Sequence, residues 1–103
     1  MKIGLDVGER MIAIGVLPRE GNIVTLKIIR DLKTRLGISA QEYQDFGIVQ
    51  DEEKFSWNQK GMVQREFDFA DVEVDLIKNC LKKLDSENKL HQDMVSVYEK
   101  FVG

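Results

Sequence analysis

Apolar residues recur at helical spacing in the second quarter of the chain. They lie three or four positions apart, at Leu26, Ile29, Leu32 and Leu36. This spacing places them on one face of a helix, which Gly37 would end. Ser39 followed by Glu42 forms a capping box, in which each residue's side chain bonds the other's backbone. The sequence therefore predicts a second, short helix over residues 40–46, ending before Gly47.

The pattern changes to alternation between residues 46 and 69. Apolar and polar residues alternate there, with the apolar ones at Phe46, Ile48, Phe55, Trp57, Val63, Phe67 and Phe69. Alternation of this kind is typical of strands with one buried face. An acidic turn at residues 51–53 and a second turn at residues 59–61 separate the runs. Together these features predict a three-stranded antiparallel meander.

The last third of the chain predicts two helices. The first has an apolar stripe of Phe69, Val72, Leu76, Cys80 and Leu84, widened by Ile77 and Leu81. Asp68 and Asp71 would begin it as an acidic cap, and its acids come before its lysines, as the helix dipole favours. The final helix would place Met94, Tyr98 and Phe101 on one side, after a cap at His91.

Residues 2–16 have two incompatible interpretations. They can form strand, turn and strand, which would place Asp6 at the end of the first strand. Alternatively they form a helix that Asp6 caps, with Glu9 completing a capping box. Its apolar face would then consist of Val7, Met11, Ile14 and Leu17. Gly8 and Gly15 count against the helix, at about 1 kcal/mol each relative to alanine.

In the strand interpretation, the string Gly4-Leu-Asp-Val-Gly8 resembles the opening of the RuvX/YqgF RNase H-like family. In that family an aspartate on the first strand precedes a glycine turn and faces a metal ion. The resemblance therefore implies a metal-dependent nuclease with Asp6 as a catalytic carboxylate. Such nucleases need several carboxylates converging on Mg²⁺. The later acidic motifs of the family are not found in this chain.

In the helical interpretation, the order of helix, helix, short helix and hairpin is winged-helix-like. We accordingly expect one α+β domain over residues 1–103, with a helical N-terminal half, the three-stranded meander and two C-terminal helices. A winged-helix nucleic-acid-binding protein is then an alternative function. Its recognition element would be residues 40–46, which contain Glu42 and Asp45 and no base. Because such a helix repels phosphate, we do not expect binding to nucleic acid.

A second resemblance extends over most of the chain. It rests on Glu9-Arg10, Leu17-Pro18, Glu20-Gly21, residues 25–30, Glu42, Trp57-Asn58, residues 81–84 and residues 98–101. In these residues the chain is similar to a group of small uncharacterised phage and prophage proteins. The resemblance implies a compact accessory protein that acts by binding, and it favours the helical N-terminus. It implies no catalytic residues.

Composition and charge narrow the classes of function. The 103 residues are 43% apolar and 32% charged, which is ordinary for one folded domain. The formal charge is −3, and residues 47–103 carry eight bases against twelve acids. Cys80 is a lone cysteine, and no apolar run is long enough to span a membrane. Asp6 and Glu9 would interrupt a signal peptide, so we expect a cytoplasmic protein, in the host cytoplasm if a phage encodes it.

The function that these observations favour is protein–protein binding by a non-enzymatic accessory protein, without metal or cofactor. A second copy of the chain is one candidate partner, as a homodimer. Lys27, Arg30 and Lys33 share one side of the predicted second helix and are candidates to contact an acidic partner. Trp57 is a further candidate, because an exposed tryptophan at a strand edge can anchor an interface. His91, without a second histidine, is expected to be a cap or a surface residue.

Overall fold

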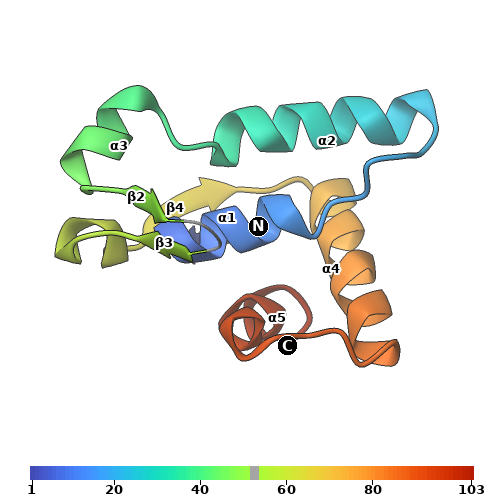
Figure 1. Cartoon of the computed structure of the whole chain (residues 1–103). Coiled ribbons are helices and arrows are strands. Elements are labelled where there is room, and N and C mark those ends of the chain that lie inside the picture. Colours follow the sequence, from blue (N-terminus) through green and yellow to red (C-terminus); the bar gives the residue numbers. More distant parts are fainter. Residues whose placement is uncertain (52–53) are drawn as a thin grey trace.

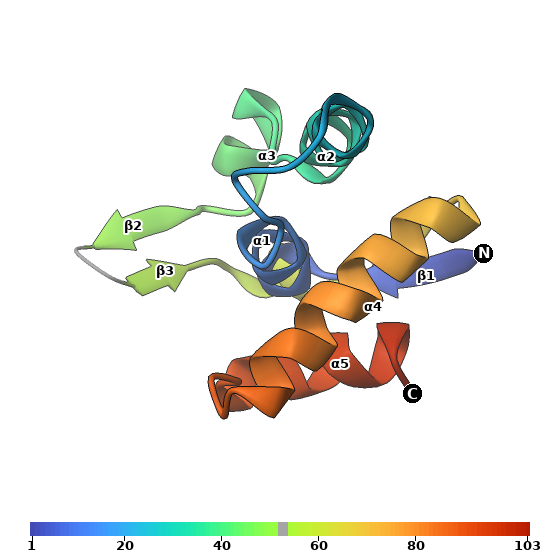
Figure 2. The same cartoon turned by 90° about the vertical axis from the view of Figure 1, so that its right-hand side faces the viewer.

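The computed structural model describes residues 1–51 and 54–103. Within them the chain forms an α+β fold in which helix α1 is central, with α2 and α5 on opposite sides of it (Figures 1 and 2). The elements in chain order are β1 (Lys2–Leu5), α1 (Val7–Gly15), α2 (Ile23–Leu36), α3 (Ala40–Asp45), β2 (Val49–Asp51), β3 (Lys54–Ser56), the 3₁₀ helix η1 (Gln59–Met62), β4 (Arg65–Asp68), α4 (Asp71–Ser86), the 3₁₀ helix η2 (Gln92–Met94) and α5 (Val95–Phe101).

Helix α1 begins at the capping box that the sequence predicts. The Asp6 Oδ1 atom accepts a hydrogen bond from the Glu9 backbone N–H at 2.8 Å, and Glu9 Oε1 accepts one from the Asp6 N–H at 3.1 Å. The helical interpretation of the residues after Asp6 is therefore confirmed, and the strand-turn-strand interpretation is wrong. Strand β1, however, precedes the helix, and the helical interpretation did not include it.

The strands pair differently from the predicted meander, which is wrong. Within the described residues, strand β2 pairs with β3 alone, and β4 pairs antiparallel with β1, so that Ile3 lies opposite Phe67 and Leu5 opposite Arg65. The fold is thus not winged-helix-like with a three-stranded sheet. Helix η1 interrupts the path from β3 to β4, and β4 turns its buried side chain, Phe67, toward the core. The acidic turn predicted at residues 51–53 includes residues 52–53, which lie outside the described part of the chain.

The core gathers one buried face from each of β1, α1, α2, β4, α4 and α5. Its residues are Ile3, Leu5, Ala13, Leu17, Ile29, Leu32, Leu36, Phe67, Phe69, Val74, Ile77, Leu81, Val97 and Phe101. In α2 the predicted stripe is buried except at its first member, Leu26. In α4 the predicted stripe is displaced: Val72 is 53% exposed and Leu76 is only partly buried. The buried face is centred on Ile77 and Leu81, because the apolar arc of α4 is wider than a single stripe.

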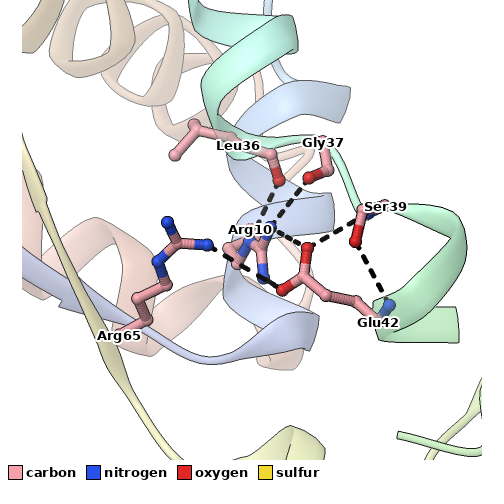
Figure 3. A network of polar contacts seen from close by, with 6 residues as sticks. All are labelled: Arg10, Leu36, Gly37, Ser39, Glu42 and Arg65. Carbon is pink, nitrogen blue, oxygen red and sulfur yellow. Dashed lines mark hydrogen bonds and ion pairs between the residues drawn. The ribbon is translucent and has the colours of Figure 1, made fainter. Parts of the chain in front are cut away.

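A buried arginine joins three helices on one side of α1 (Figure 3). Arg10 is 2% exposed and donates from Nε to the Leu36 carbonyl at 3.0 Å and from Nη2 to the Gly37 carbonyl at 2.8 Å. Its Nη1 atom donates to Glu42 Oε2 at 2.7 Å. Glu42 is also the partner of Ser39 in the predicted capping box of α3. Arg10 therefore fixes the end of α2 and the start of α3 against α1.

The neighbouring residue forms a second buried ion pair on another side of α1. Glu9 Oε1 accepts a hydrogen bond from Lys100 Nζ at 2.7 Å, and the same ammonium donates to the Gly4 carbonyl at 2.8 Å. This pair connects α1 and β1 to α5. A third ion pair, between Arg35 and Glu73, joins α2 to α4.

Candidate functional site: a groove beside Trp57

An open groove of about 620 Å³ lies between the first turns of α1 and the segment that leads into α5. Trp57, directly after β3, forms one wall of it. The lining residues are Asp6, Gly8, Glu9, Met11, Ile12, Trp57, His91, Asp93, Met94 and Ser96. Four of these are large apolar side chains, and the rest are small, polar or acidic. We refer to this feature as the Trp57 groove.

Two glycines position the indole of Trp57. A Cβ atom on Gly8 would lie 2.9 Å from ring carbons of Trp57, and one on Gly61 would lie 2.7 Å from another. Such distances are shorter than a carbon–carbon contact permits, so the ring fits only because both residues lack a side chain. Gly8 costs helix stability in α1, and this close approach gives a physical reason for its presence. Trp57 is left half-buried at the edge of the groove.

Where the structure describes the side chains, the charged residues that line the groove are all acidic. They are Asp6, Glu9 and Asp93. Burial alone would raise the pKa of Glu9, but hydrogen bonds from Lys100, the Asp6 N–H and Ser96 hold that pKa below its usual value. Glu9 is therefore ionised at neutral pH, and Lys100 balances its charge. Asp6 and the exposed Asp93 add the remaining negative charge.

The structure separates the predicted site residues into two groups. Asp6 and Trp57 line the groove, whereas Lys27, Arg30 and Lys33 are exposed on α2 and line neither this groove nor the second hollow described below. Helix α2 lies across α1 from α5 (Figures 1 and 2). The basic residues are thus on a different part of the surface from Trp57.

Asp6, the carboxylate of the nuclease alternative, is a helix cap. One of its oxygens accepts the Glu9 N–H. In residues 1–51 and 54–103, no group of three or more histidine, cysteine, aspartate or glutamate side chains is placed to hold a metal ion. The geometry around Asp6 therefore contributes to folding and to the acidity of the groove.

Several lining residues were not identified from the sequence. The sequence pattern places Met11 on the apolar face of its helix, and it contains no motif that marks Ile12, Asp93 or Ser96 as binding residues. His91 was expected to be a cap or surface residue; it is exposed at the start of η2, where its side chain makes no capping hydrogen bond. No local pattern could have found this set, because the groove forms between three segments that lie far apart in the sequence, around residues 6–12, 57 and 91–96.

A second hollow, of about 740 Å³, lies beside α3 and β4. Its charged lining is mixed and largely paired. Glu42 binds Arg10 and lies 4.0 Å from Arg65, and Arg35 binds Glu73. The guanidinium groups of Arg10 and Arg65 also stack on Phe67, 5.3 and 5.2 Å from the ring centroid. These groups already have partners within the fold, so this hollow is a weaker candidate for a binding site.

Residues that carry the phage-type resemblance have structural roles here. Glu9 and Arg10 form the two ion pairs of α1, and Glu42 completes one of them. Trp57 packs against Gly8 and Gly61, and Asn58 Nδ2 donates to the Asp45 carbonyl at 3.0 Å. The motif residues named here thus hold the fold together, and of these only Glu9 and Trp57 line the groove.

Comparisons with protein-family models, with curated proteins and with solved structures found no match to this chain. In the part of the chain that the structure describes, no helix combines the length and the apolar content that crossing a membrane requires.

Proposed function

We propose that this chain is a phage-type accessory protein that binds another protein, and that the Trp57 groove receives the partner. The observation that carries the proposal is the concave apolar surface formed by Met11, Ile12, Trp57 and Met94. Concave apolar surface with a few polar groups around it is typical of binding sites. A half-buried tryptophan is also among the residues that contribute most to binding energy at protein interfaces.

The polar groups of the groove support binding rather than proton transfer. Asp6 is engaged as the cap of α1, and Glu9 is engaged with Lys100. A general acid or base must be able to gain and lose a proton during turnover, and these contacts favour the ionised form of Glu9. The same acids would repel a phosphate backbone. Both arguments favour a protein segment as the occupant.

Selection of binders from a displayed library of random peptides tests this proposal. The expected result is enrichment of peptides that perturb the backbone amide resonances of Gly8, Met11 and Met94. Replacing Met11 with serine should abolish their binding, because it removes apolar surface from the groove. Met62→Ser is the matched control, since Met62 is 65% exposed and does not line the groove.

The proposal would be wrong if the selection enriched no peptide. It would also be wrong if the selected peptides bound Met11→Ser as tightly as the unmodified chain and perturbed amides elsewhere.

A further inference from the structure

The distribution of charge around the Trp57 groove restricts what can bind there. Three carboxylates line it, and Lys100, a cation near them, is held by Glu9 and by the Gly4 carbonyl. Asp93 is exposed and has no ion pair within the described residues, and Asp6 is half-buried at the N-terminus of α1. An acidic or neutral segment would bring no positive charge to balance the negative charges of Asp6 and Asp93.

We propose that the groove binds a protein segment in which an apolar side chain is flanked by lysine or arginine. This inference rests on the proposed function and names the chemistry of the partner. The apolar side chain would contact Met11, Ile12 and Trp57, and the flanking cations would lie near Asp6 and Asp93. Charges at the rim of an interface mainly set specificity and the association rate, so the apolar contact supplies most of the affinity.

The position of the acids supports this arrangement. Asp6 and Asp93 belong to different segments, at the start of α1 and in η2, and the groove lies between those segments. A segment that places one apolar side chain in the groove can therefore direct a basic residue on either side toward a carboxylate. The alternative occupant is a second copy of this chain, because α2 carries exposed Ile23 and Leu26 beside Lys27 and Arg30.

Three labelled peptides of equal length provide the test, by fluorescence anisotropy. Each carries the same central leucine, flanked by lysine, by serine or by glutamate. The lysine-flanked peptide should bind about 3- to 10-fold more tightly than the serine-flanked one, the range expected from two exposed ion pairs. The glutamate-flanked peptide should bind most weakly, and added salt should reduce the difference.

Charge reversal on the protein locates the effect. Asp93→Lys should remove most of the preference for the lysine-flanked peptide. Asp75→Lys is the matched control, because it makes the same change of charge on the exposed face of α4, away from the groove. The control should keep the preference.

The possible failures are distinguishable. Equal affinity for all three peptides, lost in Met11→Ser, would overturn the charge inference and leave the binding proposal standing. Absence of binding by all three would overturn this inference, while the library selection still decides the proposed function. Self-association of the unmodified chain that Asp93→Lys and Arg30→Glu each abolish would instead identify the occupant as a second copy, and the inference would be wrong.

Discussion

Glu9 and Arg10 are neighbours in the sequence, carry opposite charges, and lead to two contrasting sides of α1. Arg10 is 2% exposed, and its three nitrogens bond the end of α2 and the start of α3. Glu9 is also buried, but its side of the helix opens into the Trp57 groove. One side of α1 is closed by internal polar contacts, and the other remains accessible to a partner. The difference separates a side of α1 where polar residues stabilise the fold from a side where apolar surface stays open to solvent.

The largest loss of stability is expected when the Arg10 network on the closed side of α1 is disrupted. Arg10→Met would remove the guanidinium from Glu42, which would keep only the weaker contacts of the Ser39 N–H and Arg65, and would remove the Arg10 donor from the carbonyls of Leu36 and Gly37. Removing one partner of a buried ion pair costs about 3–5 kcal/mol, which is much of the stability of a small domain. Urea unfolding measures the loss in the free energy of unfolding, and Arg30→Met, at an exposed position, is the control. A loss below about 1 kcal/mol would show that this network does not hold α3 in place.

Acid should reduce the stability of the protein by protonating Glu42 and so weakening its ion pair with Arg10. Hydrogen bonding to the Arg10 guanidinium lowers the pKa of Glu42 more than burial raises it, so that this pKa falls from 4.5 to about 2. The pKa is depressed by folding, so this contribution to stability is fully present above pH 4.5 and is lost as the pH falls toward 2. We expect about 1–3 kcal/mol of acid-dependent stability from this group.

Unfolding measured between pH 2 and 5, the range from the folded-state pKa of about 2 to just above the usual 4.5, tests this expectation. Glu42→Gln should be less stable than the unmodified chain near neutral pH and should show a weaker dependence on acid. Glu66→Gln, at an exposed position of β4, is the control. Parallel curves for Glu42→Gln and the unmodified chain would contradict the assignment.

A smaller loss is expected on the open side, at the cap of α1. Asp6→Ala removes the acceptor of the Glu9 N–H and should cost about 0.5–2 kcal/mol. Ser39→Ala makes the equivalent change in the capping box of α3 and provides a scale for it. Thermal unfolding compares the two variants. Loss of a Mg²⁺-dependent nuclease activity in Asp6→Ala, with an unchanged melting temperature, would contradict a purely structural and electrostatic role.

The smallest effect is expected at Arg30, on the exposed face of α2. Arg30 is exposed, so Arg30→Glu should change the stability by less than about 0.5 kcal/mol. We also expect no appreciable binding of duplex DNA by the unmodified chain near physiological salt, because the neighbouring α3 is acidic. An anisotropy titration measures this. Submicromolar, salt-sensitive DNA binding that Arg30→Glu abolishes would contradict the protein-binding proposal.

Local features of the fold were predictable from the sequence. The capping boxes at Asp6 and Ser39 and the buried stripe of α2 depend on residues within one or two turns of each other. The partner of β4 was not predictable, because alternation at Phe67 identifies a strand without identifying its neighbour. The pairing with β1 depends on packing between segments that lie far apart in the sequence, as Ile3 against Phe67 illustrates.

The same distinction applies to the candidate site. Trp57 could be singled out because its residue type is unusual on a protein surface. The groove around it depends on Gly8 and Gly61, whose role in accommodating an indole is visible only in three dimensions. Asp93 and Met94 join the site because α5 packs beside α1, which no nearby residue indicates.

The position of Trp57 between two glycines at the edge of the groove also affects the fluorescence of the protein. It is the single tryptophan of the chain, so indole emission excited at long wavelength comes from one place alone. A ligand that displaces water from the Trp57 indole would shift the fluorescence emission of that indole toward the blue. It would also make the indole less accessible to a quencher dissolved in the buffer. The unlabelled protein can therefore report its own occupancy, and a compound that leaves this signal unchanged has bound elsewhere or not at all.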